Sequence, residues 1–67
     1  MTLRQTVAAN LLHMRIQRRM SQSDLALAAR LSVSYVSMLE RGLRSPPLET
    51  LARLSEALIV KPHKLLE

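Results

Sequence analysis

The side chains of this sequence that could take part in chemistry are mainly arginines. Eight of the ten basic residues are arginine, and with only five Asp or Glu the net charge is +5. There is no cysteine, and the two histidines, His13 and His63, lie far apart without a ligand pattern around them, so we expect no metal site and no cofactor. No nucleophile is accompanied by a base, and a chain of this length has little room for a substrate pocket. We therefore expect that the protein is not an enzyme. The chemistry that remains is the binding of a polyanion by guanidinium groups.

The aromatic content narrows the choice of polyanion. Tyr35 is the only aromatic residue, whereas single-stranded nucleic acids are usually bound by stacking bases on several aromatic side chains. Double-stranded DNA is therefore favoured over RNA and single strands. A membrane is disfavoured because no apolar run approaches the roughly 18 residues of a span, and the basic residues of the first helical segment gather at one end. The lack of cysteine and of a secretory signal favours a cytoplasmic protein.

Short helices must position these side chains, because helix formers dominate and alternating strand patterns are absent. Capping residues, proline and the single glycine set the expected limits. We predict helices over Leu3–Arg18 (capped by Thr2), Gln22–Ala29 (capped by Ser21, with Asp24 completing a capping box), Val33–Glu40 (capped by Ser32 and ended by Gly42), from Pro46–Pro47 to about Leu58, and over Pro62–Leu66. The fold class expected is all-α, a compact five-helix bundle forming one domain over residues 1–67.

The second and third predicted helices carry the functional information. Both have about two turns, and only Arg30 and Leu31 separate Ala29 from the cap Ser32. Two short helices joined by so tight a turn must cross at a steep angle, which is a helix-turn-helix arrangement. The second helix of such a pair fits into the major groove of duplex DNA, which is about 12 Å wide.

The same segment resembles a known family. The residues are SQxxLA beginning at Ser21, SxxYVSxLERG ending at Gly42, and PxxxL beginning at Pro47. At this spacing they resemble the phage-repressor/Cro-type (XRE-like) helix-turn-helix family over about residues 7–66. The resemblance implies a lambda-repressor-like DNA-binding domain in a small single-domain regulator.

The resemblance also implies which residues contact the bases of DNA, because each position of this sequence can be matched to a position of the family. It implies that four residues of the third helix face the major groove and read base edges, namely Val33, Ser34, Ser37 and Met38. Helix geometry places these four on one face, opposite Val36 and Leu39. Because none of the four makes a bidentate base contact, we expect specificity to draw also on DNA shape, on two half-sites, or on an arginine at the groove edge, either Arg30 or Arg44.

Phosphate contacts are expected around the same helices. The resemblance implies that Gln22 contacts a phosphate, while Arg41 and Arg44 follow the third helix and are placed to reach the DNA backbone. Ser21 is first a helix cap, and Tyr35 either packs half-buried or bonds a phosphate through its hydroxyl. The candidates for phosphate contact are Ser21, Gln22, Arg30, Tyr35, Arg41 and Arg44.

Two further expectations come from the resemblance. Arg15 and Glu40 match a partly buried ion pair that joins the first helix to the third. Positions 19 and 30 often hold glycine in the family, and a left-handed backbone there would strain Arg19 and Arg30 by about 1 kcal/mol.

A dimer is expected because one such module reads only half a site, and half-sites lie about 34 Å apart. With no separate oligomerisation segment in 67 residues, the dimer surface must come from the helical domain, and the candidates are Leu58, Ile59 and Leu66. The function predicted is a sequence-specific regulator of transcription, a repressor or controller, acting as a dimer on pseudo-palindromic operators, with no small-molecule effector implied. The alternative is an antitoxin-like interaction module whose main partner is a toxin protein.

Overall fold

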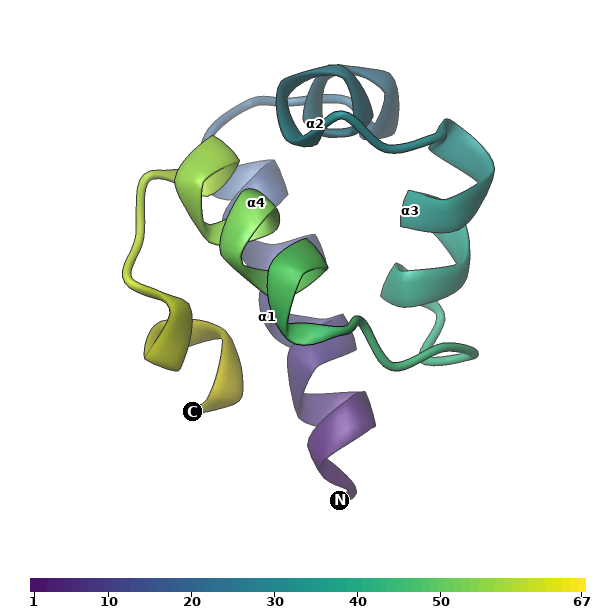
Figure 1. Cartoon of the computed structure of the whole chain (residues 1–67), viewed down its shortest axis with the longest axis vertical. Coiled ribbons are helices and arrows are strands. Elements are labelled where there is room, and N and C mark those ends of the chain that lie inside the picture. The colour runs from purple at the N-terminus through teal and green to yellow at the C-terminus, as the bar shows by residue number, and fades with distance from the viewer.

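The computed structural model describes all residues from Met1 to Glu67 and contains no strand. It consists of α1 (Leu3–Gln17), α2 (Gln22–Ala29), α3 (Val33–Glu40), α4 (Leu48–Leu58) and a short 3-10 helix, η1 (Pro62–Leu66). α2 crosses one end of the molecule above α4 and α1, α3 lies along one side, and η1 lies on the opposite side (Figure 1). None of the helices is both long enough and apolar enough to cross a membrane.

Side-chain caps begin three of the four α-helices, as the sequence predicted. Thr2 accepts a hydrogen bond from the Gln5 N–H at 3.1 Å, and Ser32 accepts one from the Tyr35 N–H at 3.1 Å. These bonds satisfy N–H groups that the first turn of a helix leaves without a partner. α4 begins differently, with Pro47 in the cap position and no side-chain cap bond.

The expectation of five helices is met only in part, because the last segment is a 3-10 turn. Its Lys64 N–H donates to the Lys61 carbonyl three residues back, at 2.9 Å. Pro62 at the start has no N–H to donate, and a segment of five residues forms too few hydrogen bonds to offset the entropy cost of starting an α-helix. The Asn10 amide donates to the Leu65 carbonyl at 2.9 Å and ties this turn to α1.

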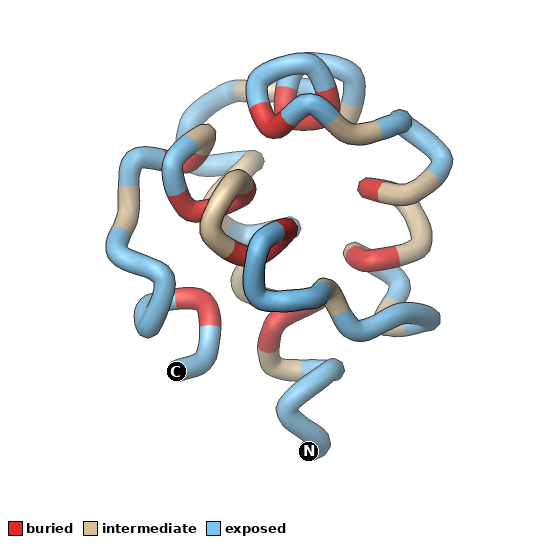
Figure 2. Tube along the Cα trace, in the orientation of Figure 1, coloured by how far each residue is buried: buried red, intermediate tan, exposed pale blue.

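One hydrophobic core joins all five elements, and the buried stretches of the tube turn toward the middle of the molecule (Figure 2). α1 contacts α3 and η1, while α2 contacts α3 and α4. The core residues are Val7, Leu11, Leu25, Ala26, Ala29, Val36, Leu39, Leu51, Leu54, Leu58 and Leu65.

One prediction about the dimer surface is wrong. Leu58 has no exposed surface, because the chain turns back after α4 and η1 packs against both α4 and α1. Leu58 therefore belongs to the core and has no surface to offer a second copy.

Candidate nucleic-acid interface

α3 presents one face to the core and the other to solvent. Val36 and Leu39 are buried at 0% and 1% exposure, and no element covers the outer side of α3 in Figure 1. The four predicted base-reading residues lie together on the outer face, Val33 and Ser34 exposed and Ser37 and Met38 half-buried. The helix therefore offers a mixed apolar and hydroxyl surface of the kind that contacts thymine methyl groups and base edges.

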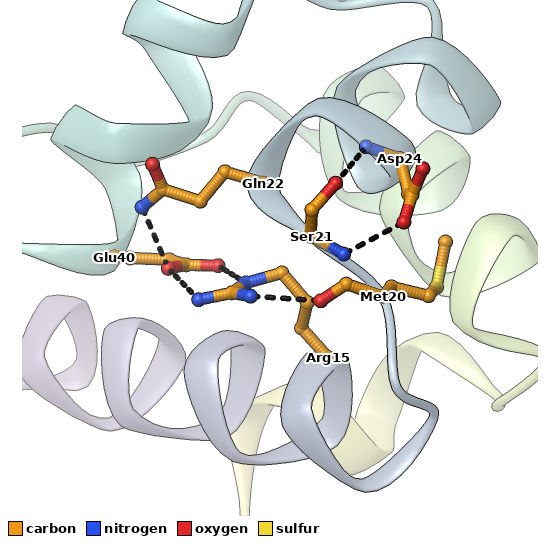
Figure 3. A network of polar contacts seen from close by, with 6 residues as sticks. All are labelled: Arg15, Met20, Ser21, Gln22, Asp24 and Glu40. Carbon is orange, nitrogen blue, oxygen red and sulfur yellow. Dashed lines mark hydrogen bonds and ion pairs between the residues drawn. The ribbon is translucent and has the colours of Figure 1, made fainter.

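A polar network fixes α3 against α1 and α2 (Figure 3). Arg15 donates from Nε to Glu40 Oε2 at 2.7 Å and from Nη2 to Oε1 at 3.1 Å, and its Nη1 donates to the Met20 carbonyl at 2.8 Å. The side chains of Arg15 and Glu40 are 13% and 4% exposed. The hydrogen bonds to Glu40 raise the pKa of Arg15 above its ordinary value, although burial acts in the opposite direction. Arg15 therefore stays charged and ties the end of α1 to the end of α3.

Gln22 joins this network, which the sequence did not predict. Its Nε2 donates to Glu40 Oε1 at 3.1 Å. An amide nitrogen has two N–H donors, so the second remains available to a phosphate while the first holds the side chain in place. The bond depends on the packing of α2 on α3, which spacing along the sequence does not reveal.

Ser21 and Asp24 form the predicted capping box at the start of α2. Ser21 Oγ accepts from the Asp24 N–H at 2.9 Å, and the Asp24 carboxylate accepts from the Ser21 N–H at 2.8 Å. The bond from the Ser21 N–H, followed by that from its side chain, lowers the pKa of Asp24 below its ordinary value. The box therefore fixes the exposed Ser21 at the start of α2.

For Tyr35 the sequence leaves two alternatives open, half-buried packing or a hydrogen bond from its hydroxyl to a phosphate. It is half-buried and packs against the core from the first turn of α3. No hydrogen bond from its hydroxyl occurs within the protein, so the ring has a packing role and the hydroxyl remains free.

Positive charge is concentrated in the segment that holds α2 and α3. From Arg15 to Arg44 there are six arginines against Asp24 and Glu40, so this segment carries +4 of the net charge of +5. Arg30, Arg41 and Arg44 are exposed and none forms an ion pair. A concentration of cations around two short helices favours the approach of a polyanion to them.

Both positions where the family often has glycine are left-handed here. Arg19 has φ 55° and Arg30 has φ 59°, and Ile59, the residue after α4, has φ 56°. Arg19 was not among the predicted contact residues, although it is exposed and lies in the turn that leads into α2. The signal that could have identified Arg19 is an arginine in the turn after a helix, at a position where the related family often has glycine.

The remaining dimer candidates lie in different places. Ile59 is 86% exposed at the end of α4, and Leu66 is 40% exposed in η1. Leu66 lines a shallow apolar groove between the start of α1, the loop after α3 and the start of α4. Two further exposed leucines, Leu3 at 60% and Leu48 at 84%, line the same groove.

Comparison with known proteins gives one matching family model. The model, described as helix-turn-helix, matches residues 11–65. This range contains α2 and α3 and continues into η1.

Relatives are found among named bacterial regulators. The chain is 44% identical over 54 residues to the HTH-type transcriptional regulator DdrOP3 of Deinococcus deserti, covering 81% of this chain and 42% of that protein. It is 42% identical over 48 residues to the control protein C.BamHI of Bacillus amyloliquefaciens, covering 72% of this chain and 59% of that one. The chain thus spans less than two thirds of the length of either relative.

A solved structure agrees with the fold over nearly the whole chain. The restriction-modification controller protein C.AhdI of Aeromonas hydrophila superposes with a TM-score of 0.89 at 32% identity, covering 92% of this chain and 94% of that one.

Proposed function

This chain belongs to the helix-turn-helix family, and on that premise we propose that it is a sequence-specific regulator of transcription that binds duplex DNA, as a repressor or a controller. The observation that carries the proposal is the uncovered outer face of α3, held rigid by the Arg15–Glu40 ion pair and surrounded by unpaired arginines. The names of the relatives, a transcriptional regulator and two control proteins, point the same way.

In this proposal α3 enters the major groove. Val33 and Met38 contact thymine methyl groups, while Ser34 and Ser37 donate to or accept from base edges. The partial burial of Ser37 and Met38 leaves Val33 and Ser34, near the start of α3, as the deepest readers. Recognition helices of this type contact bases mainly through their N-terminal residues.

Phosphate contacts surround this face. Gln22 and Ser21 donate from the start of α2, where the helix dipole also favours an anion. Arg41 and Arg44 follow α3, Arg30 lies in the turn before it, and the Tyr35 hydroxyl is free to donate. These contacts fix the orientation of the domain on DNA but carry no sequence information.

A second copy of the chain is the proposed partner on DNA. One α3 reads a half-site only, and two copies related by a twofold axis place two such helices about 34 Å apart. The surface that we assign to the dimer is the apolar groove lined by Leu3, Leu48 and Leu66, because it is the one apolar hollow on the molecule. Ile59 lies outside this lining and remains a separate candidate. The antitoxin-like alternative is not favoured, since the relatives are named for regulation and control.

Selection of bound sites from random duplexes tests the proposed function. The expected product is an inverted repeat whose half-site centres lie about one helical turn, or a multiple of it, apart.

A Ser34→Arg variant should select guanine opposite residue 34, because arginine binds guanine O6 and N7. Leu27→Arg adds the same charge at an exposed position on α2 and should leave the selected sequence unchanged. Failure of the wild-type chain to enrich any sequence would contradict the proposal.

A further inference from the structure

Three residues other than glycine have a left-handed backbone, and all three are exposed. They are Arg19, Arg30 and Ile59, with φ between 55° and 59°. An L side chain is strained in this region and glycine is not. Residues held in such conformations persist where another role compensates for the strain, and often that role is in a binding site. For two of the three positions, the structure points to the compensating role.

Arg19 and Arg30 lie at the two ends of α2. Arg19 is in the turn just before the cap Ser21, and Arg30 is the residue that ends the helix. A helix of eight residues is about 12 Å long at 1.5 Å per residue. The first helix of a helix-turn-helix crosses the DNA backbone while the second lies in the groove. A helix that crosses the backbone in this way would bring side chains at its two ends near different phosphates.

Neither guanidinium is used inside the protein. The two ion pairs of the molecule are Arg15–Glu40 and Lys64–Glu67, and no hydrogen bond leaves the side chain of Arg19 or Arg30. The neighbouring Arg18 differs, because it bonds the Met14 carbonyl at 3.3 Å and has an ordinary backbone, with φ −94°. Both strained arginines also lie in the segment that carries +4 of the net charge of +5. Internal contacts therefore do not account for arginine at these two positions.

We propose that Arg19 and Arg30 form a pair of phosphate contacts, one at each end of α2, and that the protein loses folding stability at both turns in exchange for affinity for DNA. This inference rests on the proposed function and adds Arg19, together with the linkage between strain and binding. It predicts that a single substitution at either position stabilises the fold and at the same time weakens DNA binding.

The test is a set of glycine substitutions measured in two ways. Arg19→Gly, Arg30→Gly and the double variant are compared with wild type by thermal unfolding and by fluorescence titration of a labelled mixed-sequence duplex. The duplex has about 24 base pairs, enough for two half-sites one helical turn apart, and the titrations are made at about 50 and about 200 mM salt. A mixed sequence is sufficient because phosphate contacts do not depend on sequence.

We expect each glycine substitution to raise Tm by roughly 2–5 °C, since relief of strain exceeds the entropy cost of glycine. For each bound chain, either substitution should weaken duplex binding roughly three- to tenfold at low salt and reduce the slope of log K against log salt by about 0.9. In the double variant the Tm shift and the change of slope should be about twice as large, and the two losses of affinity should multiply. Arg19→Lys keeps the charge and the strain, so its Tm and slope should stay near those of wild type.

Two control variants separate strain from charge. Ile59→Gly relieves the third left-handed position without removing a charge, so it serves as the control for thermal unfolding and should raise Tm. Lys61→Gln removes an exposed charge in the connection between α4 and η1, on the side away from α3 (Figure 1), and should change neither Tm nor the salt slope.

The outcomes distinguish this inference from the function on which it rests. If wild type binds the duplex and the glycine variants bind with the same affinity and slope, the pair is not a phosphate contact and the inference is wrong, while the proposed function stands. If Tm falls in the glycine variants, the claimed trade between stability and binding is wrong. If wild type binds no duplex at any salt, both proposals fail.

Discussion

At the scale of single residues, Arg15, whose side chain is 13% exposed, is the residue with the largest expected effect on stability. It makes three hydrogen bonds, two to Glu40 and one to the Met20 carbonyl. Arg15→Ala leaves a carboxylate that is 4% exposed with only the Gln22 amide as a partner. Removing one member of a buried pair costs about 3 kcal/mol, so Tm should fall by roughly 10 °C or more for a domain of this size. Thermal unfolding followed by circular dichroism measures the change.

The matched control is Arg18→Ala, which removes an exposed arginine from the same end of α1 and should shift Tm only slightly. The double variant Arg15→Met with Glu40→Leu replaces both charges by apolar groups and should recover much of the loss. A stability of Arg15→Ala equal to that of Arg18→Ala would contradict a structural role for the pair.

At the scale of elements, the start of α2 depends on the bond between the Ser21 hydroxyl and the Asp24 N–H. Ser21→Ala removes that bond and should cost about 1 kcal/mol, lowering Tm by roughly 4–8 °C. Ser23→Ala changes the same residue type two positions later, where no side-chain hydrogen bond is formed, and should have a much smaller effect. Equal shifts in the two variants would show that the hydroxyl does not cap the helix.

The same cap predicts a dependence on pH. Because the folded pKa of Asp24 lies below its ordinary value of 3.8, its contribution to stability is fully present above that value and is lost as the pH falls through the folded pKa. Asp24→Asn keeps an acceptor for the Ser21 N–H but lacks the charge. We expect this variant to have a lower Tm than wild type at neutral pH and to converge with wild type in acid. Parallel curves of Tm against pH would exclude the charge of Asp24 as the cause.

Local signals made most of the elements predictable, and contacts between elements made the rest unpredictable. Ser21, Ser32 and Gly42 limit α2 and α3 through short-range hydrogen bonds and backbone preference, so their bounds follow from the sequence. The burial of Leu58 depends on where η1 packs, and the bond from Gln22 to Glu40 depends on how α2 meets α3. Neither is encoded in spacing along the chain.

The candidate site follows the same division. The face shared by Val33, Ser34, Ser37 and Met38 is set by helix period, so its composition was predictable. The partial burial of Ser37 was not, whereas Met38 could already be expected to fill a gap in the core. The strained turns at Arg19 and Arg30 were expected only because the related family often has glycine at those positions. For Arg19, a direct role in binding became apparent only when its exposure and lack of internal partners were known.

At the scale of the whole molecule, the apolar groove should hold a second copy of the chain. Leu48→Glu places a charge in the groove, where burial against a partner would be costly, so this variant should be monomeric. Leu27→Glu is the matched control, because Leu27 and Leu48 are 83% and 84% exposed, both lie on helices, and the change of charge is the same. Neither residue belongs to the core, so both variants should fold.

Sedimentation equilibrium without DNA measures the outcome, and titration with the selected operator shows its consequence. Wild type and Leu27→Glu should associate, and Leu48→Glu should remain a monomer over the same concentrations. The monomeric variant must form the dimer on DNA, so it should need a higher concentration to fill an inverted repeat while binding a single half-site as well as wild type does. Association of Leu48→Glu equal to that of wild type would place the dimer surface elsewhere, with Ile59 as the next residue to change. A wild-type chain that stays monomeric both free and on the repeat would overturn the dimer itself.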